Sequence, residues 1–491
     1  MNDFDVIIVG AGLSGIGAAW RLQQQCPGLR YAVLEGRASL GGTWDLFRYP
    51  GVRSDSDMFT LGYPFRPWKG PRALASGAEI LEYVRETAQS AGIDRHIRFR
   101  HRVKSAAWSS AAQRWVLEVE ADGKPTTLRA RFLHLCVGYY SYERAHQPRF
   151  EGLDEFRGQV VHPQWWPESL DVSGKRVVVI GSGATAVTLV PELARTAAHV
   201  TMLQRSPTWY LALPGRDRLV ALLRRLLPAT WAHLAVRTRN VLLATAFFQF
   251  CRRFPRAAAR LLERGVRRHL PGRPLAPDFT PRYAPWDQRV CVVPDGDLFT
   301  SIRDGRASVV TDAVERFTER GVRLSSGRGL DADIVVTATG LELLALGGIE
   351  LQVDGRRLVP SEQVVYRGLM FADVPNLSWC VGYTNASWTL RADLAAQYLC
   401  RLINHMQAAG FTSARPDGRQ APEARRPLLE LSSGYVARAA PRLPSQGDAA
   451  PWTMRQNYLL DWRELRFAPV DEAMQFEGQT GFLLRDEAAR V

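Results

Sequence analysis

Two glycine-rich turns carry the residue spacing that is most directly tied to a known chemistry. Each follows a short apolar run, at 5–9 and at 176–180, and each precedes a run with helical periodicity. In such a turn the first glycine allows a sharp bend, the second lets a pyrophosphate approach the backbone, and a small third residue lets the helix pack on the strand. Two turns therefore predict two bound dinucleotides with electron transfer between them. They read Gly10-Ala11-Gly12-Leu13-Ser14-Gly15 and Gly181-Ser182-Gly183-Ala184-Thr185-Ala186.

The residue that follows the next strand in each unit indicates which dinucleotide binds. Glu35 follows the apolar run 31–34, and its carboxylate can accept hydrogen bonds from a ribose diol. In the second unit the run 200–203 leads instead into Arg205 and Ser206, with no acid beside them. Arg205 can pair with a 2′-phosphate, which predicts NADPH rather than NADH. It can equally be an ordinary surface arginine.

Between the two turns lies a stiff aromatic stretch at 156–167, Phe-Arg-Gly-Gln-Val-Val-His-Pro-Gln-Trp-Trp-Pro. On residue types alone it fits a well-packed interdomain loop. Its spacing, F-x-G-x-x-x-H-x-x-x-W-P, resembles the fingerprint of type I Baeyer–Villiger monooxygenases, which are flavoproteins that use FAD and NADPH. The resemblance implies that the stretch links the FAD and NADPH domains and moves with them, without being the chemical centre. The fingerprint positions are Phe156, Gly158, His162, Trp166 and Pro167.

A second motif of the same family occurs at 41–55, a stretch that by residue types alone is an ordered loop. Its pattern G-G-x-W…Y-P-G-x-x-x-D resembles the family segment that lines the flavin ring. The residues of this stretch, like those of 382–390, are similar to the corresponding sequences in the subgroup of ethionamide-activating monooxygenases. The resemblance implies that Asp55 orients the catalytic arginine and that Val103 contacts the FAD adenine. The cofactor contacts implied for the loop are Gly42, Thr43, Trp44, Arg53, Ser54 and Asp55.

Arg289 is the residue to which this resemblance assigns the oxygen chemistry. It follows Trp286-Asp287-Gln288 and precedes the apolar run 290–293. Without the resemblance it is a structural arginine. In Baeyer–Villiger enzymes a Lys-Arg pair occupies these positions; the arginine stabilises the flavin peroxide, and the lysine helps to bind the NADPH 2′-phosphate. Here Gln288 replaces the lysine, so the prediction of NADPH rests mainly on Arg205.

The resemblance also implies a reaction. NADPH reduces FAD, the reduced flavin captures O₂ as a flavin peroxide, and the peroxide attacks a small apolar ketone to give an ester or a lactone. The same machinery can instead oxygenate sulfur or nitrogen, with a sulfide as one possible substrate. A non-oxygenating NADPH-dependent flavoprotein reductase has the same two-dinucleotide plan, although the lack of a C-x-x-C pair is unfavourable for a disulfide reductase. A basic protein without flavin that binds a membrane surface or nucleic acid is the non-enzymatic alternative.

The elements that must position these residues follow from the repeated order of strand, turn, helix and strand. This order predicts an α/β fold with two Rossmann-like dinucleotide-binding domains, one for FAD and one for NADPH. Leucine, alanine and arginine in helical spacing predict a helical insertion in the NADPH domain. The run 333–340 resembles the A-T-G hinge motif of two-dinucleotide flavoproteins. The predicted segments are 1–143 and 375–491 for the FAD domain, 144–212 and 283–374 (with the return linker) for the NADPH domain, and 213–282 for the insertion.

Composition limits the remaining classes. The net charge of +14 comes mostly from scattered arginines, and no helix-turn-helix, zinc-finger or aromatic RNA-binding motif is present, so we expect no nucleic-acid partner. The six separated cysteines predict no metal site. A first strand close to Met1 and an uncharged run of only 240–251 predict a cytoplasmic protein. The basic insertion can contact a membrane surface, cover the substrate cavity, or be a solvated helix with one core face.

Overall fold

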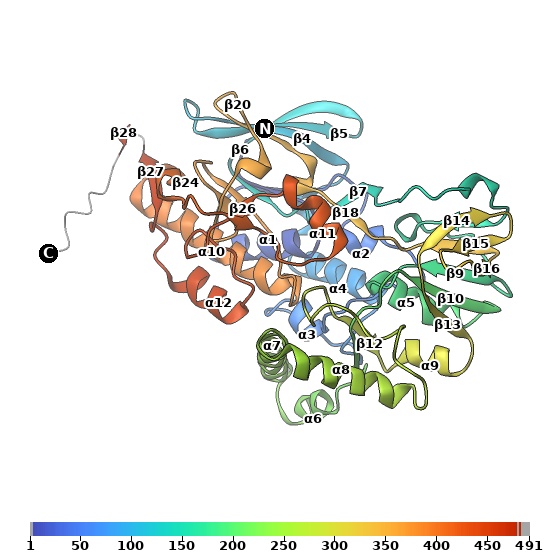
Figure 1. Ribbon diagram of the computed structural model, residues 1–491. Coiled ribbons are helices and arrows are strands. Elements are labelled where there is room, and N and C mark those ends of the chain that lie inside the picture. The colour runs from blue at the N-terminus through green and yellow to red at the C-terminus, as the bar shows by residue number, and fades with distance from the viewer. Residues whose placement is uncertain (1–2, 479–480, 483–491) are drawn as a thin grey trace.

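A computed structural model describes residues 3–478 and 481–482 and contains two separate parallel arrangements of strands (Figure 1). In the first sheet five strands run parallel, in the order β23-β6-β1-β2-β3. Val6, Ile7 and Ile8 at its centre are completely buried, as expected for a strand covered on both faces. The bounds are β1 Asp3–Val9, β2 Tyr31–Leu34, β3 Ile97–Arg98, β6 Lys124–Leu135 and β23 Leu377–Trp379.

An antiparallel meander extends this sheet on the other side of β6. The turn between β5 and β6 has positive φ at Asp122 (48°) and Gly123 (78°), which is the conformation that a two-residue hairpin turn requires. This Asp-Gly pair therefore suits the tight turn that joins the two antiparallel strands. Beyond β4, the late strands β19 and β20 complete the sheet. The bounds are β4 His101–Ser109, β5 Arg114–Ala121, β19 Glu350–Val353 and β20 Arg356–Leu358.

Helices on the first sheet supply much of the main core. The helix α1 (Leu13–Gln25) starts at the first glycine turn and contacts α10 (Trp388–Ala409), which returns from the far end of the sequence. Arg21 of α1 forms a buried ion pair with Asp393 of α10 at 2.7 Å. The other helices here are α2 Thr43–Leu46, α3 Met58–Leu61, α4 Gly77–Ser90, α11 Gly434–Ala439 and α12 Tyr458–Phe467.

The second sheet has five parallel strands in the order β13-β10-β9-β17-β8, which is a Rossmann-like arrangement around the second glycine turn. The predicted α/β fold with two dinucleotide-binding units is therefore confirmed. A small antiparallel sheet of β14, β15 and β16 lies beside it. The bounds are β8 Gln159–Val161, β9 Arg176–Ile180, α5 Ala184–Leu193, β10 His199–Gln204, α9 Asp297–Arg303, β13 Ala307–Thr311, β14 Val314–Thr318, β15 Gly321–Leu324, β16 Gly329–Asp331 and β17 Ile334–Thr337.

Two connectors join the sheets and pair with each other. β7 (Tyr140–Ala145) leaves the first sheet, and β18 (Leu341–Leu343) returns antiparallel to it. The hydroxyl of Thr339 donates to the carbonyl of His146 at 2.6 Å, next to this pair. The domain boundaries stay predictions, but β19 and β20 show that the chain has rejoined the first sheet by residue 350, inside the segment 283–374.

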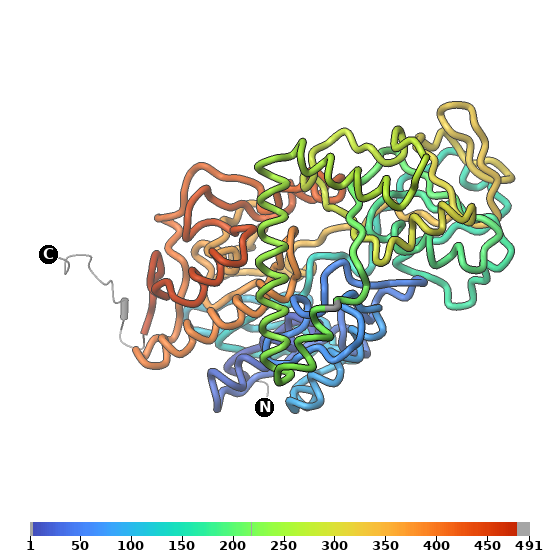
Figure 2. Tube along the Cα trace, turned by 90° about the horizontal axis from the view of Figure 1, so that it is seen from below, coloured from blue at the N-terminus to red at the C-terminus, as the bar shows by residue number. Residues whose placement is uncertain are grey.

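The segment predicted to be helical contains three helices between the paired strands β11 and β12. In Figure 1 they form the underside of the molecule, and in Figure 2, seen from below, α7 runs across the front. The bounds are β11 Tyr210–Leu213, α6 Arg218–Leu226, α7 Ala229–Arg253, α8 Pro255–His269 and β12 Cys291–Pro294. The remaining strands are β21 Val365–Tyr366, β22 Met370–Phe371, β24 Phe411–Pro416, β25 Arg426–Pro427, β26 Ser445–Gln446, β27 Met474–Gly478 and β28 Gly481–Phe482.

Candidate active site

Two glycines of the first turn are required by the packing of the protein itself, whereas the third has room for a side chain. Gly10 has φ +103°, and a Cβ there would lie 2.5 Å from the carbonyl oxygen of Cys136. A Cβ on Gly15 would lie 1.8 Å from the carbonyl oxygen of Gly10, so helix and strand can approach only without a side chain. At Gly12 the nearest atom would be 3.7 Å away, an ordinary contact. Gly12 thus leaves its backbone open to a group from outside, which fits a pyrophosphate.

The second glycine turn repeats the pattern. Gly181 has φ +142°, and a Cβ there would meet the carbonyl oxygen of Ala338 at 2.3 Å. Gly183 has nothing within 4 Å of its Cβ position, and Ala186 is completely buried where α5 packs on the sheet. The hydroxyl of Ser182 donates to the carbonyl of Ser206 at 3.0 Å, which ties the turn to the end of β10. Both turns therefore fit the dinucleotides that the sequence predicts.

Glu35 supports the first turn directly. One carboxylate oxygen accepts from the backbone N–H of Ala11 and the other from that of Arg37, both at 2.9 Å. Burial raises the pKa of Glu35 above its ordinary value, and these two hydrogen bonds partly offset that rise. Each oxygen keeps a second lone pair, so the predicted contact with a ribose diol remains possible. In α1, Ser14 accepts a hydrogen bond from the indole of Trp388 at 2.9 Å, and Leu13 is buried.

The loop 41–55 connects the two turns. Gly42 precedes α2 and lies against Gly12, so the loop begins beside the first turn. Phe47 and Tyr49 belong instead to the core of the second sheet. Burial raises the pKa of Tyr49 to about 12, and the side chain of Thr185 in the second turn partly offsets that rise. Within the loop, Thr43 lies near enough to Tyr142 to lower the pKa of that phenol slightly against the effect of burial, and Trp44 packs against the main core.

Three further predicted residues, Arg53, Ser54 and Asp55, end this loop. Arg53 forms an ion pair with Asp297 of α9 at 2.5 Å, so it joins the loop to the second domain. Its Nε is buried and lacks a hydrogen-bond partner within residues 3–478 and 481–482. The Ser54 hydroxyl accepts from the N–H of Ser56 at 2.9 Å. Val103, buried in β4, pairs with Val119, and its contact with adenine stays a prediction.

Arg289 and Asp55 influence each other across this interface. Burial raises the pKa of Asp55 above its ordinary value, while the cations Arg289 and Arg53 oppose that rise. Burial lowers the pKa of Arg289, but Asp55 and neighbouring phenols more than compensate and raise it above its usual range. Within the described part of the chain, no ion pair shorter than 4.0 Å joins Arg289 to Asp55. Asp55 therefore acts on the guanidinium by its charge and leaves its donors available.

Three phenols lie near enough to Arg289 to influence its pKa, and the sequence did not reveal them. Tyr139, Tyr140 and Tyr435 all contribute to the raised pKa of Arg289. The hydroxyls of Tyr139 and Tyr140 are hydrogen-bonded at 3.0 Å, and the ring of Tyr139 stacks on that of Trp388 with centroids 4.9 Å apart. These residues come from the start of β7 and the residue before it, from α10 and from α11, and they share no local spacing that could mark them as a group.

The backbone around Arg289 is held from several directions. Trp286 has φ +69°, a conformation that is costly for a bulky residue and that is often kept at functional sites. Asp287 pairs with Arg252 of α7 at 2.7 Å, and its carbonyl accepts from the N–H of Ser432 at 2.8 Å. These contacts fix the segment that leads into β12, and Arg289 lies in that segment, just before the strand begins.

Arg205 is exposed at the end of β10, where a 2′-phosphate contact was predicted. In the described chain it forms no ion pair with a carboxylate. Arg438 of α11 lies near enough to influence it: burial lowers the pKa of Arg438, and the positive charge of Arg205 adds to that effect. Arg438 also reaches the hinge, since its Nη2 lies 3.6 Å from the Cβ position of Gly340. Sequence spacing gave no indication of Arg438.

The aromatic fingerprint lies at the junction of the second sheet and the connectors. Phe156 packs edge-on against Phe317, and a Cβ on Gly158 would lie 2.4 Å from the carbonyl oxygen of Asp333. The Nδ1 of His162 accepts from the N–H of Gln164, whose side chain donates to the carbonyls of Ser141 and Tyr142 in β7. Trp166 is partly buried against the second core and Pro167 is exposed. The position supports the predicted linking role, which stays a prediction.

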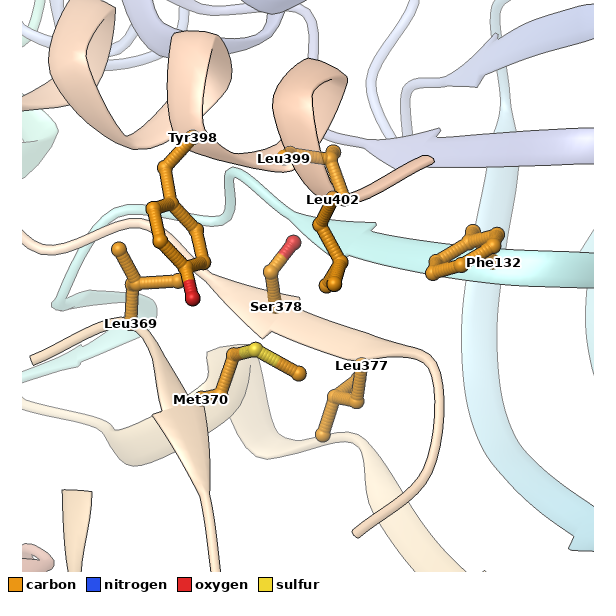
Figure 3. A pocket seen from close by; sticks show the side chains of 8 residues that line it. All are labelled: Phe132, Leu369, Met370, Leu377, Ser378, Tyr398, Leu399 and Leu402. Carbon is orange, nitrogen blue, oxygen red and sulfur yellow. The ribbon is translucent and has the colours of Figure 1, made fainter. Parts of the chain in front are cut away.

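Two small cavities differ in their relation to this site. One recess shares Tyr139 and Trp388 with this site, and its lining also includes Gly382, Tyr383, Thr384 and apolar side chains. The gap in Figure 3 lies between β23 and α10 and has no room for a water molecule. None of the residues lining that gap is among those around Arg289, so we assign it to packing. Its lining is Phe132, Leu369, Met370, Leu377, Ser378, Tyr398, Leu399 and Leu402.

Comparison with known proteins agrees with this arrangement. The family model "Flavin-binding monooxygenase-like" matches residues 59–218, and "NAD(P)-binding Rossmann-like domain" matches residues 8–75. Among solved structures, a steroid monooxygenase bound to NADP aligns with a TM-score of 0.76 at 23% identity, over 97% of this chain and 100% of the other. Cyclohexanone monooxygenase aligns with a TM-score of 0.75 at 19% identity and the same coverage. These similarities concern the fold.

Relatives in sequence are much closer. The FAD-containing monooxygenase EthA of Mycobacterium tuberculosis is 51% identical over 95% of this chain and 96% of its own length. The putative FAD-containing monooxygenase MymA of the same organism is 48% identical over 96% and 97% of the two chains. The probable FAD-binding monooxygenase AlmA of Acinetobacter sp is 46% identical over 96% and 95%. With identity near one half over nearly its whole length, the chain belongs to the family of FAD-containing monooxygenases that includes EthA, MymA and AlmA.

Proposed function

We propose that this monooxygenase uses FAD and NADPH to insert one oxygen atom from O₂ into a small apolar ketone, giving an ester or a lactone. The observation that supports the proposal best is the position of Arg289. It lies among phenols and within the electrostatic influence of Asp55, where the loop from one glycine turn meets the other. The names of the relatives include FAD, and one structural neighbour is bound to NADP.

Different residues of the chain bind the cofactors, stabilise charge and exclude water in the proposed reaction. Bound FAD supplies the oxygen activation, which no amino-acid side chain can perform. Gly12 and Gly183 leave the backbone open for the two pyrophosphates, and Arg205, with Arg438 nearby, offers positive charge to the 2′-phosphate of NADPH. Arg289 stabilises the negative charge that develops beside it, and Asp55 keeps its guanidinium oriented. The phenols and Trp388 exclude water from this region.

Oxygenation of a sulfide or an amine is the second candidate. The segment 382–390 resembles the ethionamide-activating subgroup, and residues 382–384 of that segment line the recess beside Tyr139. A recess with these apolar and aromatic walls can take a sulfide as readily as a ketone. Both candidate reactions rely on Arg289, so it is the product formed from each substrate that distinguishes them.

A panel of matched ketones and sulfides tests the proposal. Purified protein should be yellow, and heat should release FAD rather than FMN. NADPH oxidation and product chromatography are then measured for each substrate in turn. An ester or lactone from the ketone supports the first candidate, and a sulfoxide alone supports the second. Flavin reduction with no oxygenated product from either substrate would contradict both candidates.

We also propose a cytoplasmic location with peripheral contact to a membrane through the basic segment 213–282. None of the helices in the described residues combines the length and the apolar composition needed to cross a bilayer. In that part of the chain the proposed contact is therefore with the membrane surface. Small-molecule substrate and O₂ are the other expected partners.

A further inference from the structure

Exposed apolar side chains are concentrated on the helical segment. Of the 18 large apolar side chains that are exposed in the described residues, 11 lie between residues 213 and 261. Leu226 of α6 is 69% exposed and Trp231 of α7 is 64% exposed. Scattered single apolar residues are normal on a surface, whereas so many exposed apolar side chains on one helical segment indicate an interaction site. The other members are Leu213, Leu219, Leu222, Leu227, Leu234, Leu242, Leu243, Phe254 and Leu261.

The outward face of α7 is uncharged along most of the helix. Trp231, Leu234 and Leu242 follow one another at helical spacing and are all exposed. The helix has only two charged residues before Arg252. Arg237 is buried and donates to the carbonyls of Phe59 and Gly62 at 2.7 and 2.8 Å, and Arg239 pairs with Asp217. Neither places a free charge on the outer face.

Positive charge surrounds this apolar face. Residues 213–270 contain thirteen arginines and two acidic residues, which gives +11 of the +14 carried by the whole chain. Six exposed arginines at the α7–α8 corner and along α8 form no ion pair within the described residues. Both views place α6, α7 and α8 on one side of the molecule, so they can meet a flat surface together (Figures 1 and 2). The six are Arg253, Arg256, Arg260, Arg264, Arg267 and Arg268.

We propose that the outer face of α6 and α7 lies on an anionic lipid membrane, with its leucines and Trp231 in the interface and the arginines of α8 on the headgroups. Charge decides between this occupant and a second copy of the chain. Two copies would bring segments of +11 against each other, whereas an anionic surface neutralises the same charge. Aliphatic side chains beside arginines are typical of helices that lie in the membrane plane.

The inner face of α7 explains how docking can leave the enzyme intact. Asn240 donates to the carboxylate of Asp57 at 2.8 Å, and Arg237 caps the carbonyls around α3. These contacts are on the side of α7 that faces the protein, two residues along the chain from Asp55. Docking uses only the opposite side, so substitutions there should not change the rate of flavin reduction by NADPH in solution.

Vesicle sedimentation of the full-length holoprotein tests the proposal. Wild type should bind phosphatidylglycerol-containing vesicles at about 0.05 M salt and dissociate near 1 M, where screening is nearly complete. Vesicles of phosphatidylcholine alone should bind little. The variant Arg260→Gln/Arg264→Gln/Arg267→Gln/Arg268→Gln should lose about 100-fold or more in vesicle affinity. The variant Leu222→Ser/Leu226→Ser/Trp231→Ser should lose about tenfold or more at low salt, because its apolar contact area is removed.

Matched controls carry equivalent changes elsewhere. Leu153→Ser/Val160→Ser removes exposed apolar side chains, and Arg320→Gln/Arg323→Gln/Arg356→Gln/Arg357→Gln removes four exposed arginines. Both controls should bind vesicles as wild type does, and thermal unfolding should show that every variant is folded. Absence of wild-type binding at low salt, or equal losses in variants and controls, would overturn the proposal. Dimerisation through Leu226 and Trp231 without vesicle binding would assign the face to a second copy instead.

Discussion

Arg289 differs from the many arginines of this chain that pair directly with a carboxylate. Asp55 influences it only from beyond 4 Å, and its other neighbours are the phenols of Tyr139, Tyr140 and Tyr435. An arginine keeps its charge at every accessible pH, so the guanidinium remains a cation with donors to spare. That is the property needed to stabilise a negative charge that exists only during the reaction.

Replacing Arg289 should separate the two halves of the catalytic cycle. Arg289→Ala is expected to lower oxygenated product by about 10²–10³-fold, because one preorganised donor is lost. Flavin reduction by NADPH should continue, since hydride transfer needs geometry rather than this cation. Arg289→Lys should recover little, because a flexible ammonium does not reproduce a planar fork. Stopped-flow reduction without oxygen and product yield with oxygen measure the halves separately. Full product yield from Arg289→Ala would disprove the assigned role.

Asp55 should give the reaction an acidic limit. Burial raises the pKa of this carboxyl, so protonation removes its negative charge at a higher pH than for an ordinary aspartate. The rate of oxygenation should therefore fall as pH decreases through that raised pKa. Asp55→Asn should lower the rate at neutral pH and abolish this acidic limb of the pH profile. If the variant keeps the same limb, another group is responsible for it.

Arg205 should determine the choice of coenzyme. A charge-assisted contact contributes roughly 1.5–3 kcal/mol, so Arg205→Ala should reduce the preference for NADPH over NADH by about 10- to 100-fold. Gln288 cannot add the ionic contact of a lysine, so we expect the lower end. Fluorescence titration with NADP⁺ and NAD⁺ measures affinity independently of turnover. The matched control is Arg195→Ala, an exposed arginine paired with Glu192, which should change neither affinity.

At this scale the sequence predicted residues that belong to continuous motifs and missed those that do not. Gly10, Gly15 and Glu35 act within a single turn and its two strands, so their spacing is visible in the chain. Tyr435 and Arg438 reach the site only because α11 folds back from the far end of the sequence. No local sequence pattern indicates that these two residues lie near the site. Arg53 was predicted to contact cofactor, and its observed partner is Asp297.

At the scale of elements, the two glycine turns allow a sharp test of cofactor binding. Gly15→Ala should fail to fold stably, since its Cβ would lie 1.8 Å from the Gly10 carbonyl oxygen. Gly12→Ala meets no such obstacle and should fold, yet bind FAD more weakly, because the methyl group occupies space needed by the pyrophosphate. Thermal unfolding of the apoprotein and FAD titration distinguish the effects. Normal FAD affinity in Gly12→Ala would mean that the pyrophosphate lies elsewhere.

The order of elements was largely predictable, whereas their partners in space were not. The Asp122-Gly123 turn fixed the meander because its chemistry is local. The pairing of β19 with β4 was not predicted, because residues 350–353 have the pattern of any exposed strand. They pair with β4 only because that edge of the first sheet is free in the folded protein. The pairing of β7 with β18 is invisible for the same reason: two short connectors meet only after both sheets have formed.

Over the whole molecule, buried histidines should make stability depend on pH. Burial lowers the pKa of His134, His162 and His233 from 6.5 to about 4. The unfolded chain therefore binds more protons than the folded one below pH 6.5. The free energy of unfolding should therefore keep its full value above pH 6.5. Between pH 6.5 and about pH 4 it should decrease progressively, by roughly 3 kcal/mol for each histidine. Urea denaturation at several pH values measures this loss.

A pair of variants tests the cause of that loss. His134→Gln should make the free energy of unfolding less dependent on pH, by the contribution of one histidine. The reason is that the buried ring that resists protonation has been removed. His96→Gln, at an exposed position, should leave the slope unchanged. Equal slopes for both variants and wild type would attribute the acid sensitivity to other groups.

The discontinuity of the first sheet has a consequence for how the chain is made. β1, β2 and β6 leave the ribosome first, but β6 gains its outer parallel neighbour only when β23 arrives, about half the protein later. The second sheet uses residues 159–337 alone and can close as soon as they emerge. Domains fold as units during synthesis, and an unpaired strand edge is a hazard while it waits. Of the two parallel sheets, the one that begins the chain is completed last.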